Sequence, residues 1–158
     1  MVCFVTVCCA AKKPILEAQP YARAIENSFT QAFTSKGCPV MAYAIMPNHV
    51  HLLLRNEGAD LISTIGEWKS HSTQLLWRLG LEGPLWQRSF YDHFLRKEED
   101  VETVAIYIAQ NPARAGLPLD RRYAWHQWMT GRARRPAPTE GAKSGPPGEG
   151  PPCPPIGP

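Results

Sequence analysis

The chain has 158 residues, of which 44% are hydrophobic and 20% charged, and a formal net charge of +3. This composition is typical of a soluble globular domain and excludes a wholly disordered chain, and no apolar run is long enough to span a bilayer. The N-terminal Met-Val-Cys-Phe-Val-Thr-Val has no positively charged flank, so we expect no signal peptide, no membrane association and a cytoplasmic location. The small positive charge permits a polyanionic partner without requiring one.

The first part of the chain predicts a strand, a helix and a hairpin. Residues 2–7 are mostly β-branched or aromatic, which favours a strand. Apolar residues recur at helical spacing from Ala18 to Ser35, and Gly37 follows in the usual place of a C-terminal cap. Residues 40–45 and 49–55 predict two more strands, and Pro47-Asn48 between them favours a tight turn.

The second part predicts a helix, a strand and a last helix. Apolar spacing indicates a helix from Leu61 to Leu79, and strand-forming residues follow at 90–95. A helix is expected from Glu98 to Gln110, because its first turn is acidic and Pro112 opposes continuation past Asn111. This order predicts an α+β fold: the ferredoxin-like βαββαβ antiparallel sheet with an added C-terminal helix.

The C-terminal segment differs from the rest in composition. Nine of the 16 prolines lie from Pro136 onward, after a short basic run of Arg132, Arg134 and Arg135. We therefore predict one folded domain, residues 1–130, and a disordered Pro/Gly-rich tail, residues 131–158. The basic run either adds non-specific affinity for DNA or is a solvated part of the tail.

His49-Val50-His51 is the most informative short motif. Side chains alternate along a strand, so both imidazoles are expected on one face, about 7 Å apart along the backbone. Two imidazoles in this arrangement can bind one metal ion between them. The alternative is that one or both histidines are structural or face the solvent.

Tyr107 and Asn111 form a second candidate pair on the last predicted helix. Their i, i+4 spacing places them on one face, at the edge of the apolar stripe. A hydroxyl and an amide oxygen opposite two imidazoles would suit a nucleophile beside a metal. The alternative is that Tyr107 is a half-buried structural anchor.

Three blocks of sequence together resemble a known family. They are Met-Pro-Asn-His-Val-His-Leu-Leu, Leu-Trp-Gln-Arg-Ser-Phe-Tyr-Asp-His-Phe-Leu-Arg and Tyr-Ile-Ala-Gln-Asn-Pro-Ala-Arg-Ala-Gly-Leu. In this order and spacing they are similar to the REP-associated tyrosine transposases, which belong to the bacterial single-tyrosine HUH transposase superfamily. The resemblance extends from about Phe4 to Trp128 and implies the same ferredoxin-like fold.

The resemblance assigns roles to individual residues. It implies that His49 and His51 bind a divalent metal, Mg²⁺ or Mn²⁺, that Asn111 completes the metal site, and that Tyr107 is the nucleophile. Tyr91, in the second block, is a rival for the nucleophile. The implied protein is a metal-dependent transposase and endonuclease that acts as a monomer or homodimer. It would cleave and rejoin single-stranded DNA, at hairpin-forming repeats, through a 5′-phosphotyrosine.

Two other functions stay open. One is a DNA hairpin-binding protein, derived from a transposase, that no longer cuts; the other is a small metal-binding protein unrelated to DNA. The chain begins almost inside the first strand and carries a tail outside the expected domain. These departures from the family pattern raise the hypothesis of a degraded or mis-started gene copy, which bears on activity more than on fold.

Basic side chains are the candidates for contacts with DNA phosphates. They are Lys69, Arg88, Arg96, Arg114, Arg121 and Arg122. Trp68, Trp77 and Trp86 are candidates for stacking on unpaired bases. The alternative for each is a solvated charge or a core aromatic residue.

Overall fold

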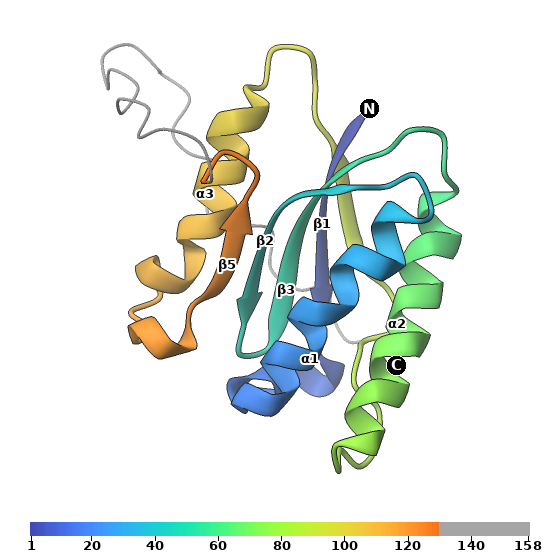
Figure 1. Ribbon diagram of the computed structural model, residues 1–158, viewed down its shortest axis with the longest axis vertical. Coiled ribbons are helices and arrows are strands. Elements are labelled where there is room, and N and C mark those ends of the chain that lie inside the picture. The colour runs from blue at the N-terminus through green and yellow to red at the C-terminus, as the bar shows by residue number, and fades with distance from the viewer. Residues whose placement is uncertain (130–158) are drawn as a thin grey trace.

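A five-stranded antiparallel sheet with the order β4-β1-β3-β2-β5 forms the centre of the protein (Figure 1). The computed structural model describes residues 1–129, so the predicted tail and its basic run lie outside the described residues. The strands are β1 (Val2–Cys8), β2 (Val40–Met46), β3 (His49–Arg55), β4 (Tyr91–Phe94) and β5 (Tyr123–His126). The three α-helices are α1 (Gln19–Phe29), α2 (Leu61–Arg78) and α3 (Val101–Arg114). Within residues 1–129 no helix is both long and apolar enough to cross a membrane.

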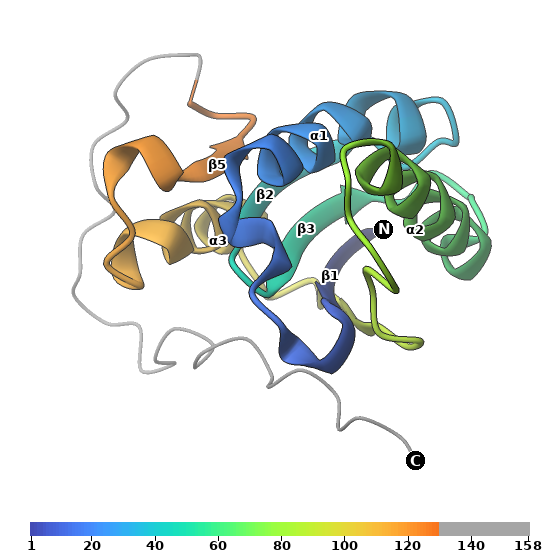
Figure 2. The same ribbon diagram turned by 90° about the horizontal axis from the view of Figure 1, so that it is seen from below.

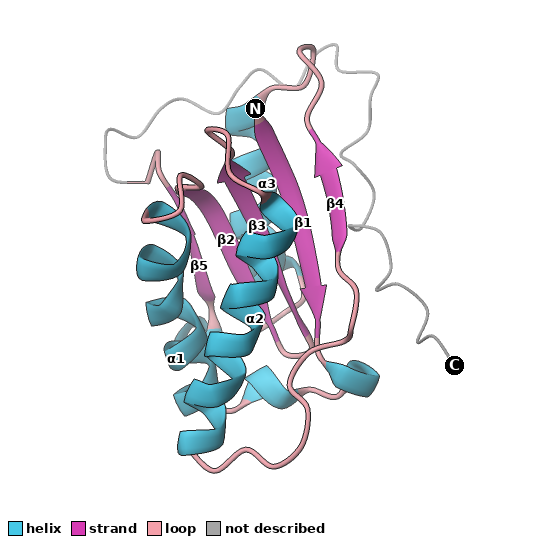
Figure 3. Ribbon diagram, turned by 90° about the vertical axis from the view of Figure 1, so that its right-hand side faces the viewer, coloured by secondary structure: helices cyan, strands magenta, loops and turns pink. Residues whose placement is uncertain are grey.

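Helices cover both faces of the sheet. Helices α1 and α2 pack side by side on one face, and α3 packs on the other (Figures 2 and 3). The central strands β1 and β3 are therefore buried on both faces, which explains why β1 is apolar at every position except Thr6 and why β3 has an unbroken apolar run over residues 52–54. The edge strands β4 and β5 have only four residues each, a length that discourages further edge-to-edge pairing.

The predicted α+β fold with an antiparallel βαββαβ sheet is confirmed, with one strand added. Strand β5 pairs with the free edge of β2 and was not predicted from the sequence. Its four residues, Tyr-Ala-Trp-His, are too few to show a period, and they become a strand because β2 offers an unpaired edge. The predicted helix over 18–35 is α-helical only to Phe29 and continues as a π-helical turn over Thr30–Thr34.

The prediction that Pro112 opposes continuation of the last helix past Asn111 is wrong, because α3 includes Pro112. The helix begins at Val101, where Asp100 caps it by accepting a hydrogen bond from the Glu102 N–H, and it continues through Pro112 to Arg114. Proline has no N–H for the carbonyl four residues earlier, which is that of Ile108. The Asn111 side chain compensates, because its Nδ2 donates to the Ile108 oxygen at 3.1 Å. The helix therefore tolerates the proline without leaving that carbonyl unpaired.

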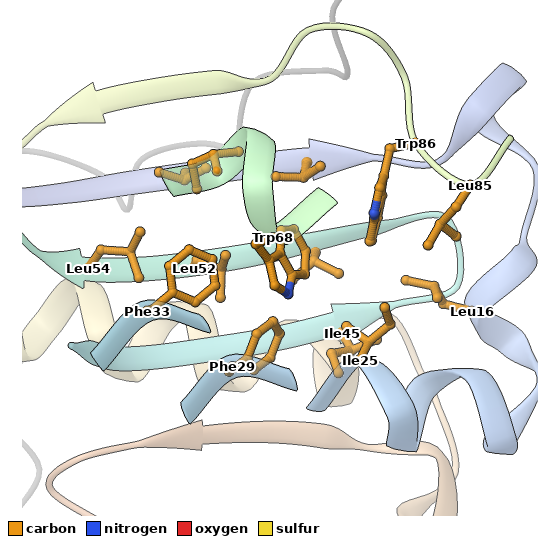
Figure 4. Packing of buried hydrophobic residues seen from close by; sticks show 14 of the residues in the cluster. Leu16, Ile25, Phe29, Phe33, Ile45, Leu52, Leu54, Trp68, Leu85 and Trp86 are labelled. Carbon is orange, nitrogen blue, oxygen red and sulfur yellow. The ribbon is translucent and has the colours of Figure 1, made fainter. Parts of the chain in front are cut away.

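Aromatic rings dominate the core between the sheet and helices α1 and α2 (Figure 4). Trp68 is the largest fully buried side chain, and its ring lies near those of Phe29, Phe33 and Trp86, at centroid distances of 5.7, 5.5 and 5.1 Å. Its indole N–H donates to the Ser28 hydroxyl at 2.8 Å, so the one polar atom of the ring is paired. This cluster fixes α1 and α2 relative to each other.

Replacing Phe29 with alanine should destabilise the protein by about 3–5 kcal/mol, because the truncation leaves a cavity among packed rings. Urea denaturation followed by tryptophan fluorescence measures the loss. The matched control is Ile62→Ala on α2, whose side chain is 75% exposed and whose loss should cost less than about 0.5 kcal/mol. Equal effects of the two substitutions would contradict this account of the core.

Candidate active site

His49 and His51 lie on the face of the sheet that α3 covers. Leu53, two residues further along β3, packs with Ala105 and Ile108 of α3, and the period of a strand places both histidines on the same face as Leu53. The two rings converge, with their Nε2 atoms 3.1 Å apart. The prediction that the imidazoles share one face therefore agrees with the geometry.

The Nδ1 atom of each imidazole, on the side away from the other ring, has a hydrogen-bond partner. His49 Nδ1 lies 2.6 Å from Asn48 Oδ1, and His51 Nδ1 lies 2.9 Å from Thr6 Oγ1. An amide oxygen only accepts hydrogen bonds, so His49 carries its proton on Nδ1 and turns the lone pair of Nε2 toward His51. A hydroxyl donates or accepts, so Thr6 suits either tautomer of His51.

The hairpin turn that carries His49 is anchored by a segment distant from β2 and β3 in sequence. The Pro47 oxygen accepts from the Leu16 N–H at 2.9 Å, and the Asn48 oxygen accepts from the Cys9 N–H at 2.8 Å. Both hydrogen bonds hold the turn against the chain that leaves β1. The His49 ring is thereby placed by backbone contacts as well as by the strand.

Burial keeps both imidazoles neutral at neutral pH. Desolvation lowers the pKa of His49 to about 4. It lowers the pKa of His51 to about 3, with a smaller contribution from the nearby His49. A neutral imidazole is the form that binds metal, so no proton has to be removed first.

The spacing of the two nitrogens fits a divalent cation. Two nitrogens that each lie about 2.1 Å from one ion are about 3.0 Å apart when their bonds are at right angles, as in an octahedral site. Within residues 1–129 no group of three or more His, Cys, Asp or Glu side chains could enclose a metal ion. Further ligands would have to come from an amide, from water or from a bound phosphate.

Tyr107 and Asn111 lie together on one side of α3. The Asn111 Nδ2 donates to the carbonyl oxygens of Tyr107 and Ile108, both at 3.1 Å, so Oδ1 is the end of the amide that is left for a cation. The guanidinium carbon of Arg114 lies 4.2 Å from the centre of the Tyr107 ring. Tyr107 is half-buried, and its helix packs on this face of the sheet through Ala105 and Ile108.

Tyr91, the rival nucleophile, lies on the same face by register. It pairs with Thr6 on β1, and Thr6 pairs with His51 on β3, so the three residues form one row across the sheet. Strands are spaced about 4.8 Å apart, which puts the Tyr91 backbone about 10 Å from that of His51. The two candidate nucleophiles thus belong to different elements, Tyr91 to β4 and Tyr107 to α3.

The six predicted DNA-binding residues lie on several different segments of the fold. Lys69 Nζ, on α2, donates to the backbone oxygens of Gln87 and Arg88 at 2.5 and 3.0 Å, and Arg88 is exposed beside it. Arg96 follows β4 and is also exposed. Near the end of α3, Arg114 stacks on Tyr107, Arg121 donates to the Glu17 oxygen at 2.6 Å and Arg122 donates to the Leu117 oxygen at 2.7 Å.

Sequence reasoning missed the two partners of the histidines. Asn48 directly precedes His49, but it was interpreted only as a turn residue. Thr6 is the one hydroxyl-bearing side chain in β1, and a polar residue in the middle of an apolar strand was the available signal. The link from Thr6 to His51 joins residues 45 positions apart, which no local pattern reveals.

Comparison with known proteins agrees with the fold and the sequence blocks. Residues 2–111 match the family model described as IS200-like transposase. A solved structure of a REP-associated tyrosine transposase bound to a REP hairpin is similar, with 22% identity, a TM-score of 0.59 and coverage of 74% of this chain and 69% of that one. A candidate transposase from Deinococcus radiodurans is 17% identical, with a TM-score of 0.55 and coverage of 74% and 91%. No curated protein matches the chain.

The unfolding free energy, measured in EDTA, should fall as the pH drops below about 6.5. Below that pH the unfolded chain binds protons on His49 and His51. In the folded protein the pKa of His49 is about 4 and that of His51 about 3, so both imidazoles stay neutral at pH 5. Urea unfolding at pH 7 and pH 5 measures the difference. The His49→Gln/His51→Gln double variant should lose less stability between these pH values. The control His71→Gln, at an exposed histidine of α2, should behave as the wild type.

Proposed function

The chain belongs to the family of IS200-like transposases, and from that premise we propose that it cleaves and rejoins single-stranded DNA through a 5′-phosphotyrosine on Tyr107. The observation that carries the proposal is the convergence of His49 and His51 Nε2, 3.1 Å apart, on the face of the sheet that α3 covers. A pair of neutral imidazoles aimed at one point is suited to hold a cation against a phosphate.

His49, His51 and Asn111 are the proposed metal ligands. A bound Mg²⁺ or Mn²⁺ would polarise the scissile phosphate and offset the charge that develops on it. Asn48 and Thr6 orient the two rings, so that both Nε2 atoms are aimed at the same position. Three protein ligands leave coordination positions for phosphate oxygens, which suits a hard octahedral ion.

Tyr107 supplies the nucleophile in this proposal. Its phenolic oxygen attacks phosphorus and loses its proton, the bond from phosphorus to the 3′-oxygen breaks, and that oxygen takes up a proton to become a free 3′-hydroxyl. The Arg114 guanidinium, 4.2 Å from the ring centre, holds the ring and places a positive charge near the phosphate under attack. The phosphotyrosine conserves the phosphodiester bond energy, so another 3′-hydroxyl can displace Tyr107 and rejoin DNA without ATP.

The DNA substrate is proposed to be a hairpin with unpaired flanks. The similar solved transposase is bound to a REP hairpin, which supports a structured single strand as the partner. The scattered positions of the basic residues also favour a substrate that touches the protein at several points. A uniform duplex lying on one basic face would require a continuous patch.

The Tyr107→Phe variant should form no covalent adduct with hairpin oligonucleotides in Mg²⁺ or Mn²⁺, because phenylalanine lacks the attacking oxygen. The wild-type protein should form an adduct that survives denaturing electrophoresis. Tyr91→Phe is the matched control, since it removes the hydroxyl of the rival tyrosine, and it should retain the adduct.

Each other outcome points to a different function. Adduct formation by Tyr107→Phe, with loss in Tyr91→Phe, would make Tyr91 the nucleophile and refute the role given to Tyr107. Hairpin binding by the wild type with no adduct in either metal would indicate a non-cleaving hairpin-binding protein. Metal binding without affinity for any hairpin would indicate a metal-binding protein unrelated to DNA.

Thr6→Val should weaken Mn²⁺ binding by about 10- to 100-fold, because valine cannot orient His51 through Nδ1. Thr6→Ser, which keeps the hydroxyl, should bind Mn²⁺ nearly as the wild type does. Titration followed by electron paramagnetic resonance of free Mn²⁺ measures both without any need for DNA. Identical affinities of the valine and serine variants would remove Thr6 from the metal site.

A further inference from the structure

The side chain of Gln87 lies on the face of the sheet opposite helix α2. The segment before β4 pairs with the end of β1, since Trp86 forms a bridge with Cys9 and the Gln87 N–H donates to the Cys8 oxygen at 2.8 Å. The Trp86 ring points into the core on the α2 side, where its centre lies 5.1 Å from that of Trp68 (Figure 4). Successive residues of a paired strand point to opposite faces, so Gln87 points to the face that carries the two histidines.

Gln87, Cys8 and His49 form one row across that face. Cys8 pairs with His49 in the register of β1 and β3, and paired residues of antiparallel strands share a face. Two strand spacings of about 4.8 Å place the backbones of Gln87 and His49 about 10 Å apart. The next row, two residues away along β1, is the one that joins Tyr91 to His51. Gln87 therefore lies beside the point where the two imidazoles converge.

The Gln87 side chain carries an unpaired hydrogen-bond donor. The residue is only 9% exposed, and its Nε2 is buried without a hydrogen-bond partner within residues 1–129. The two other such atoms in this part of the chain belong to Tyr123 and His126, on strand β5 at the opposite edge of the sheet. A buried donor without an acceptor costs free energy in the folded protein, and an acceptor on a ligand would recover it.

The backbone of Gln87 is held in place by two other elements. Its N–H is bonded to β1, and its oxygen accepts from Lys69 Nζ, on α2, at 2.5 Å. The same ammonium group donates to the Arg88 oxygen at 3.0 Å, so the segment is attached to α2 at two successive residues. The side chain has three rotatable bonds, which lets the amide turn toward a ligand from a fixed backbone position.

A phosphate oxygen is the acceptor that suits this donor. None of the residues that form the two rows, from the Gln87 and Tyr91 ends to β2, is acidic, so no carboxylate in them repels an anion. A cation held by the histidines would bind one non-bridging oxygen of the scissile phosphate. The second non-bridging oxygen also gains charge during the reaction, and a preoriented amide N–H stabilises such an oxygen.

We propose that Gln87 binds the non-bridging oxygen of the scissile phosphate that the cation does not hold. Gln87 Nε2 donates a hydrogen bond to that oxygen and stabilises the charge that develops on it while tyrosine attacks phosphorus. Gln87 is thus a phosphate-binding residue and not a metal ligand. This inference rests on the proposed function, from which it takes the DNA phosphate and the cation at the histidines.

The Gln87→Leu variant separates this role from a structural one. Formation of the covalent adduct with hairpin oligonucleotides in Mn²⁺ should slow on the order of 100-fold, while the affinity for Mn²⁺ without DNA stays as in the wild type. The urea midpoint of unfolding should be unchanged or higher, because leucine removes a buried donor that has no partner. Gln87→Met, closer to glutamine in shape, should behave in the same way. Gln74→Leu, at an exposed position of α2, is the control without effect.

Sulfur substitution at the scissile phosphate identifies the oxygen that Gln87 binds, because sulfur is a weak hydrogen-bond acceptor. The two phosphorothioate diastereomers are each compared with the normal phosphate in Mn²⁺. In one diastereomer, sulfur should slow adduct formation by the wild type but cause little further loss in Gln87→Leu, as expected when both changes remove the same contact.

Four results would overturn the role of Gln87 and leave the proposed function in place. They are adduct formation by Gln87→Leu at the wild-type rate, a lower urea midpoint in both Gln87 variants, a loss of Mn²⁺ affinity, and equal sulfur effects in wild type and variant for both diastereomers. A lower midpoint would make Gln87 a structural residue, and weaker Mn²⁺ binding would make it a metal ligand. Absence of any adduct from the wild type would overturn the proposed function as well.

Discussion

The pairing of β1 with β3 is the constraint on which the candidate active site depends. Its register sets Thr6 opposite His51 and Cys8 opposite His49. Because side chains alternate along a strand, a slip of one residue would move both imidazoles to the face occupied by α1 and α2. The aromatic core on that face, built around Trp68, excludes such a slip, since Val50, Leu52 and Leu54 would leave it. Packing on one face therefore fixes the position of the two histidines on the other.

Burying two imidazoles and a hydroxyl in the middle of a sheet is costly unless each polar atom is paired. Each polar atom has a partner: Asn48 Oδ1 lies beside His49 Nδ1, Thr6 Oγ1 lies beside His51 Nδ1, and the two Nε2 atoms face each other. Their approach is favourable when one Nε2 donates a proton to the other or when a cation lies between them. This position, between the two Nε2 atoms, is the metal site of the proposed function. The two candidate tyrosines lie on different elements, Tyr107 on helix α3 and Tyr91 on edge strand β4.

Much of the architecture could be predicted from local pattern. The hairpin at Met46-Pro47-Asn48, helix α2 and the apolar central strands follow from periodicity and turn chemistry, and all three are present. The errors occurred where another group compensates for an unfavourable local pattern. Pro112 does not end α3, because Asn111 pairs the carbonyl that the proline leaves open. Strand β5 forms on four residues because β2 has an edge to pair with.

The sequence by itself determined the fold class, the family resemblance and the common face of His49 and His51, because each follows from order and spacing along the chain. Only the tertiary structure decided the partners of those histidines and the row that joins Tyr91 to His51 through Thr6. Each of these depends on contacts between elements far apart in sequence. Their geometry is set by strand register and core packing, which a single sequence does not display.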